Sequence, residues 1–150
     1  MLAKKFALGF GIAIIFPMLI HYGVSTFSHA PKWEDRYDSH FYQRYQNATP
    51  EEKVKLDKER DEKDKAWREK QKVFERHLFI VAVPAGIAAI IIGATLPLQA
   101  IGTGLMFGGI FSLTEGYMFY WTALQDWMRF LSLLAAFIVL IFVGYRKLAK

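Results

Sequence analysis

The stretch LFIVAVPAGIAAIIIGATLPLQAIGTGLMFGGIFSLT, from Leu78 to Thr114, has 37 residues and no formal charge. A single helix of this length would be about 55 Å long, whereas the hydrocarbon core of a bilayer is only about 30 Å thick. The chain must therefore turn back, and Pro97 is the natural turn because proline breaks the helical hydrogen-bond ladder. This stretch predicts a tight antiparallel pair of transmembrane helices, over about 78–96 and 98–120.

Two more apolar runs lie on either side of this pair. Residues 6–26 and residues 130–145 each lack Lys, Arg, Asp and Glu, and each approaches the roughly 20 residues that a membrane-spanning helix needs. The first run follows Lys4 and Lys5, a pattern that is typical of a signal anchor. The sequence therefore predicts an all-α membrane protein with four transmembrane helices.

A long polar segment separates the first apolar run from the second. Residues 28–77 contain 13 Lys/Arg and 12 Asp/Glu, so most of the excess positive charge lies at the two chain ends. Basic ends beside apolar helices indicate anchoring in a lipid bilayer rather than binding to nucleic acid. The chain has no Cys and therefore no thiolate ligand, and we expect no metal site and no cofactor.

These patterns divide the chain into four parts. They are a first transmembrane helix that resembles a signal anchor (1–27), an aromatic interfacial loop (28–49), a charged extramembrane helix (50–77) and a three-helix transmembrane region (78–150, with spans at about 78–96, 98–120 and 130–145).

The charged helix has a recognisable start. The sequence TPEE at 49–52 predicts a capping box with proline in the first turn. From there the chain reaches the next apolar run without Gly or Pro, so we expect a helix continuous with the second span. A solvated helix is one interpretation, and the alternative is a helix that binds a protein partner through Trp67 and Phe74, one heptad apart.

Four aromatic residues recur at every fourth position before this helix. Trp33, Tyr37, Phe41 and Tyr45 would form a single stripe if the segment were helical. The simpler interpretation is an interfacial helix that lies on the lipid headgroups. The alternative is an aromatic docking surface for a partner.

Glu115 is the only acidic residue inside a predicted span. A carboxylate within a membrane is costly without a partner, and His21 and Arg129 are the residues that we expect to reach it. We interpret this intramembrane polar cluster as structural, an ion pair that fixes the register of the helices. The functional alternative is a group that relays protons or binds a cation.

Small residues recur four positions apart in three of the predicted spans. In lipid, close backbone approach at such positions allows helices to pack. We expect helix packing, within the chain or in a homo-oligomer, at five glycines: Gly11, Gly86, Gly93, Gly104 and Gly108.

Four spans place both termini on one side of the membrane and residues 28–77 on the other. The number of Lys and Arg in the loop favours a cytoplasmic loop, whereas the basic, acid-free tails and the signal-anchor start favour cytoplasmic termini. We expect an integral protein of the cell or inner membrane, with cytoplasmic termini and residues 28–77 on the opposite side.

The sequence carries no Walker loop, nucleophile elbow or zinc-binding HExxH motif. We therefore expect a small non-enzymatic membrane protein, an accessory or scaffolding subunit whose charged helix contacts a partner or the lipid surface. The first alternative is a subunit of an ion or proton transporter that uses Glu115. The second alternative is a membrane-embedded enzyme.

Overall fold

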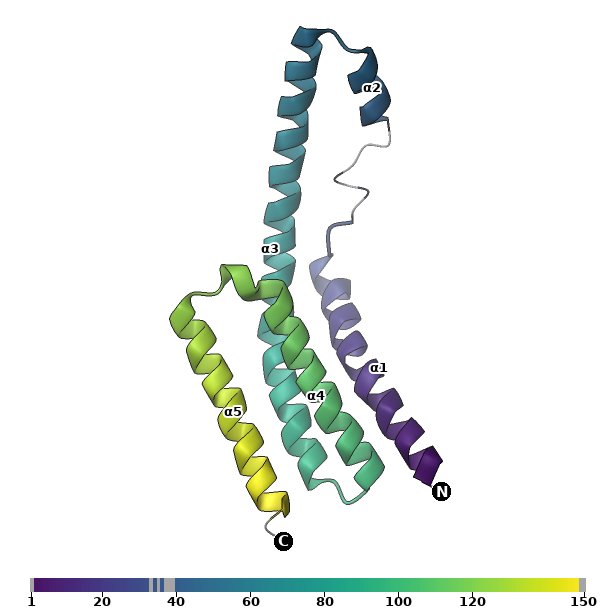
Figure 1. Cartoon of the computed structure of the whole chain (residues 1–150), viewed down its shortest axis with the longest axis vertical. Helices are drawn as coiled ribbons and strands as arrows, with labels where there is room; N and C mark the ends of the chain where they lie inside the picture. Colours follow the sequence, from purple (N-terminus) through teal and green to yellow (C-terminus); the bar gives the residue numbers. More distant parts are fainter. Residues whose placement is uncertain (1, 33, 35, 37–39, 149–150) are drawn as a thin grey trace.

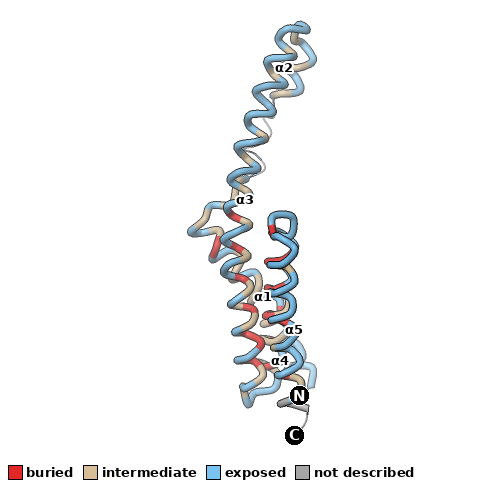
Figure 2. Tube along the Cα trace, turned by 90° about the vertical axis from the view of Figure 1, so that its left-hand side faces the viewer, coloured by how far each residue is buried: buried red, intermediate tan, exposed pale blue. Residues whose placement is uncertain are grey.

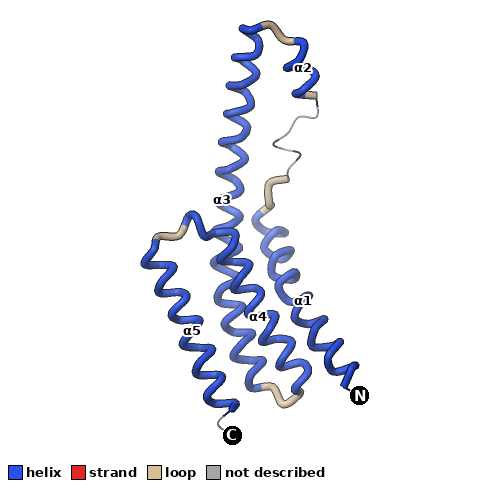
Figure 3. The backbone as a smooth tube through the Cα atoms, in the orientation of Figure 1, coloured by secondary structure: helices blue, strands red, loops and turns tan. Residues whose placement is uncertain are grey.

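The computed structural model describes residues 2–32, 34, 36 and 40–148, and every long element within them is an α-helix. In chain order the elements are α1 (Leu2–Ser28), α2 (Phe41–Asn47), α3 (Pro50–Thr95), α4 (Gln99–Tyr120), the short 3-10 helix η2 (Trp121–Ala123) and α5 (Asp126–Leu148) (Figure 1). The connections after α2, α3 and α4 are short (Figure 3).

Three of the long helices pack on one another. α4 contacts both α1 and α3, α1 also contacts α3, and α5 packs on α3 from the side. Both termini lie at the same end as the turn between α3 and α4, and η2 lies at the other end (Figure 1). The N-terminal half of α3 projects beyond η2, with α2 beside its tip.

Among the described residues, three helices are long and apolar enough to cross a membrane, namely Leu2–Ser28, Pro50–Thr95 and Asp126–Tyr145. α4, which the sequence predicts to be a fourth span, is not among them. α4 carries five glycines and Glu115. This composition suits a helix that two neighbours, α1 and α3, cover. The long helices bury the faces that meet and expose their outer faces (Figure 2), as expected where lipid covers the apolar exterior.

α3 is one continuous helix of 46 residues, which corresponds to about 69 Å. It begins at the predicted capping box, in which the Thr49 N–H donates to Glu52 Oε2 at 2.8 Å and Thr49 Oγ1 accepts from the Glu52 N–H at 3.4 Å. It ends at Thr95, directly before the turn that contains Pro97. Its charged half and its apolar half therefore share one helical backbone.

Glycines bring the backbones of α3 and α4 into close contact. A Cβ atom on Gly86 would lie 2.7 Å from the carbonyl oxygen of Gly109, and one on Gly93 would lie 2.6 Å from the carbonyl oxygen of Gly102. Only glycine allows this approach without displacing the neighbouring backbone. The two helices therefore form a tight antiparallel pair.

The contact between α1 and α4 uses a different glycine from the one expected. Gly104 meets the backbone of Gly9, and a Cβ atom on Gly108 would lie 2.9 Å from Cβ of Phe16. Gly11, which the four-residue spacing predicts to pack, has nothing within 4 Å of its Cβ position. Gly11 therefore makes no close helix contact within the described chain, because spacing alone does not fix which face of α1 turns toward α4.

We predict that Gly86→Ala lowers the free energy of unfolding by about 1–3 kcal/mol, because the added methyl group must push the Gly109 carbonyl away. Gly144→Ala is the matched control, since its Cβ position is open and alanine favours the helix over glycine. Unfolding in mixed detergent micelles measures both variants. Equal stability of the two would contradict the close packing of α3 on α4.

Candidate functional site

A polar pair joins α1 to α4 within the apolar part of the molecule. His21 Nδ1 and Glu115 Oε1 lie 2.7 Å apart, and the two side chains are 28% and 22% exposed. The pair forms one hydrogen bond whether the proton resides on the imidazole or on the carboxyl. The structure thus brings together two of the three residues of the predicted polar cluster.

Aromatic rings surround the imidazole. The ring centroid of Phe74 on α3 lies 5.6 Å from that of His21, at 71° to its plane, and the Phe119 centroid on α4 lies 6.1 Å away. Tyr22, the next residue on α1, makes a further edge contact at 5.6 Å. These rings hold the imidazole in place from three helices and keep its surroundings apolar.

The pair opens onto a groove of about 500 Å³ between α1 and α4. The groove is lined by Ile14, Pro17, Met18, His21 and Tyr22 from α1 and by Phe111 and Glu115 from α4. Within the described part of the chain, His21 Nε2 and Glu115 Oε2 make no further hydrogen bond, and neither atom is sealed inside the protein. One donor or acceptor position on each side chain is therefore available in the groove.

Arg129 does not join this pair. Its Nη1 donates to Asp126 Oδ1 at 2.9 Å and its Nη2 donates to the carbonyl oxygen of Trp121 at 2.6 Å. Its guanidinium also lies 4.7 Å from the centre of the Trp121 ring. The structure does not bring Arg129 to Glu115, because these bonds hold its guanidinium at the connection between α4 and α5.

The aromatic segment before α3 is not an isolated surface stripe. Phe41 and Tyr45 lie on α2 and stack with a centroid distance of 5.7 Å. α3 places two cations against them, with Lys53 Nζ 5.4 Å from the Tyr45 ring and Arg60 Cζ 5.8 Å from the Phe41 ring. α2 therefore docks on the charged half of α3. The other two members of the predicted stripe, Trp33 and Tyr37, lie outside the described residues.

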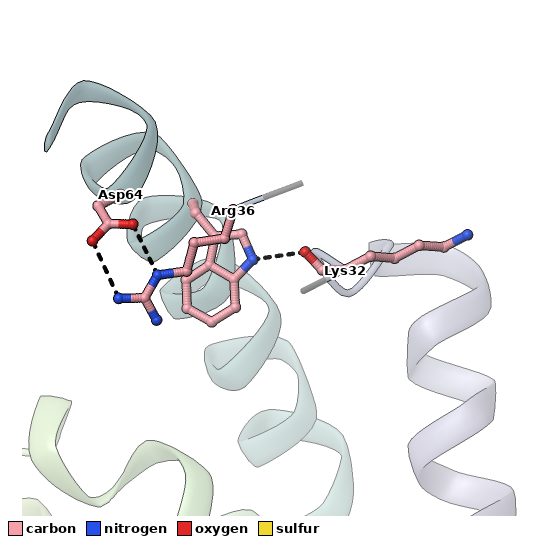
Figure 4. A network of polar contacts seen from close by, with 4 residues as sticks. Lys32, Arg36 and Asp64 are labelled. Carbon is pink, nitrogen blue, oxygen red and sulfur yellow. Dashed lines mark hydrogen bonds and ion pairs between the residues drawn. The ribbon is translucent and has the colours of Figure 1, made fainter. Parts of the chain in front are cut away.

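Trp67 belongs to a polar network that ties the segment after α1 to α3. Arg36 Nε donates to Asp64 Oδ1 at 2.8 Å, and Arg36 Nη2 donates to Asp64 Oδ2 at 3.2 Å (Figure 4). The guanidinium lies 5.1 Å from the centre of the Trp67 ring, and the Trp67 indole N–H donates to the carbonyl oxygen of Lys32 at 3.0 Å. The Arg36 hydrogen bonds hold the pKa of Asp64 below its ordinary value.

Phe74 is buried rather than offered to a partner. Its side chain is 3% exposed and packs in a cluster with Val24, Leu78 and Ala82. The spacing of Trp67 and Phe74 predicts that both face a partner from one side of the helix. In the structure, Trp67 contacts Lys32 and Arg36, and Phe74 packs in a buried cluster. Their partners lie on other elements, and no short-range pattern in the sequence marks those contacts.

The described residues contain no group of three His, Cys, Asp or Glu side chains that could hold a metal ion. Comparison of the chain with protein-family models, curated proteins and solved structures gave no match. The site itself consists of one hydrogen-bonded pair beside a groove.

We predict energetic coupling between His21 and Glu115. In a double-mutant cycle of His21→Ala and Glu115→Ala, the coupling energy should be roughly 0.6–1.7 kcal/mol, as measured for hydrogen bonds between membrane helices. The matched cycle of Arg129→Ala and Glu115→Ala should give additive effects. Detergent unfolding supplies the free energies. Coupling of Glu115 to Arg129 instead of His21 would show that the polar pair is wrongly assigned.

Proposed function

We propose that the chain is a small four-span integral membrane protein, an accessory or scaffolding subunit that holds a docking arm outside the bilayer. The arm consists of α2 and the charged half of α3, residues 41–77. The observation that carries the proposal is the continuity of α3, which joins this arm to the apolar half of the same helix without a break. Such a helix keeps a docking surface at a fixed height above the membrane.

The position of α4 supports four spans rather than three. Its 22 residues correspond to about 33 Å, enough to cross the hydrocarbon core. It lies antiparallel to α3 and between α3 and α1, so it must occupy the same depth as its neighbours. A helix shielded on two sides needs less apolar surface than one that faces lipid all round.

We further propose that both termini lie in the cytoplasm and that the arm lies on the opposite side. The basic ends support this orientation, since Lys4 and Lys5 lie in the first turn of α1 and the last residues of the sequence carry three more cations and no acid. A second support is that the start of α1 and the end of α5 lie at the same end of the long helices, opposite the arm (Figure 1).

The arm is braced along its length. α2 packs against the tip through the cation contacts of Phe41 and Tyr45. The Arg36 and Asp64 pair holds the connecting segment nearer the base. An isolated charged helix frays readily in water, so these contacts support a rigid arm rather than a flexible tail.

Charge is unevenly distributed along the arm. The tip, residues 41–64, contains six Lys/Arg and seven Asp/Glu, whereas the base, residues 65–77, contains five Lys/Arg and two Asp/Glu. Cations near a membrane surface are attracted to anionic headgroups, so the base suits the lipid surface. The acidic tip suits a basic surface on a protein partner.

A transporter subunit is the second candidate, and the short distance between His21 and Glu115 favours it. A relay across the bilayer needs further polar groups at other depths. The apolar half of α3 and the first sixteen residues of α4 carry no formal charge. A single pair therefore supports a structural anchor better than a continuous pathway.

The docking proposal is tested with a photo-crosslinking amino acid at Val54, near the tip. Val73, near the base, is the matched control, because the two valines are 56% and 54% exposed. In native membranes Val54 should crosslink one protein of defined mass and Val73 should crosslink mainly lipid. Reversal of the charge at Asp61 and Glu62 should lower the protein adduct about tenfold, as should high salt, which screens exposed charges.

Two results would contradict the docking proposal. One is the absence of a protein adduct at Val54 although the variant is inserted in the membrane. The other is an adduct whose yield changes neither with salt nor with the reversed charges at the tip, because the acidic surface would then play no part in docking.

A further inference from the structure

The groove between α1 and α4 leaves polar atoms facing apolar surroundings. If the chain spans the bilayer as proposed above, this groove lies beside acyl chains, where an unsatisfied donor or acceptor is unfavourable. His21 Nε2 and Glu115 Oε2 have no partner among the described residues, and the groove has a volume of about 500 Å³. The two free positions therefore border space that a ligand can occupy.

In apolar surroundings a pair without net charge costs the least free energy, and the pair presents the same hydrogen-bonding pattern in both of its net-neutral forms. With the imidazolium beside the carboxylate, Nε2–H is a donor and Oε2 is an acceptor. With the protonated carboxyl donating to Nδ1 of the neutral imidazole, Nε2 carries the remaining proton and Oε2 is again an acceptor. A hydroxyl group both donates and accepts, so it can satisfy the two positions together.

We infer that the groove binds a neutral, hydroxyl-bearing lipid whose head hydrogen-bonds to His21 and Glu115. A phosphate or an ammonium head fits less well, because the net-neutral pair offers no charge to compensate it. This inference goes beyond the docking function and rests only on the proposed placement in the bilayer.

The depth and lining of the groove point to the same class of ligand. Glu115 precedes the last residue of α4, Tyr120, by five positions, which places it about 7.5 Å below the end of that helix. This is below the level of charged headgroups and close to that of a glycerol hydroxyl. Ile14, Met18 and Phe111 supply apolar walls for the start of the acyl chains. Diacylglycerols and lipid-soluble quinols share the required hydroxyl.

The test uses the full chain in phosphatidylcholine nanodiscs with a photoreactive diacylglycerol as the probe. Insertion into the nanodiscs is measured first, and a chain that does not insert would contradict the proposed position in the bilayer itself. Adducts are then mapped to peptides of α1 and α4. Unlabelled dioleoylglycerol should compete at least tenfold better than the same lipid with its hydroxyl acetylated. Competition by a decyl quinol that exceeds that of dioleoylglycerol would assign the hydroxyl chemistry to a quinol.

Two variants separate the site from general lipid contact. Met18→Trp fills the groove without removing either member of the pair and should lower the adduct yield about tenfold. Leu19→Trp is the matched control, because Leu19 is 67% exposed and lies outside the groove. Glu115→Leu should also lower the yield and abolish the preference for the free hydroxyl. Equal labelling of all variants, or equal competition by the acetylated lipid, would overturn the inference.

Discussion

A helix that passes without interruption from a charged to an apolar sequence constrains the rest of this molecule. Backbone polar groups in lipid must be bonded within the protein, and the helical hydrogen bonds of α3 meet this requirement along its apolar half except at Pro84, which has no N–H to donate. The same helix begins with a capping box at Thr49 and carries dense opposite charges up to Arg76. Wherever the apolar half of α3 lies, the charged half must project from it along the same axis.

The close contact of α3 with α4 determines what α4 can carry. Glycines at positions such as Gly86 and Gly109 let the two backbones touch, so van der Waals packing holds the pair together. Because α4 is covered by α3 and α1, it tolerates Glu115 in its sequence. His21 then meets this carboxyl from α1, and residues of the same two helices line the groove beside the pair.

The sequence predicted local features well and long-range contacts poorly. The turn at Pro97 and the capping box at Thr49 are encoded within a few residues, and the structure has both. The sequence leaves two candidate partners for Glu115, and only the helix arrangement distinguishes His21 from Arg129. The network of Arg36 with Asp64 joins residues 28 positions apart, and no periodic pattern marks it. The face of α1 that packs was likewise missed, since Gly9 rather than Gly11 meets α4.

The central claim is that one helix crosses from water into lipid near His77. The chain has no Cys, so single spin labels can be placed in turn along α3 from residue 66 to residue 95, and their exposure to oxygen and to a water-soluble nickel reagent can be measured. The account predicts nickel exposure before residue 77, oxygen exposure after it, and one unbroken helical periodicity through both regions. Nickel exposure along the whole helix, or a loss of periodicity at the boundary, would contradict it.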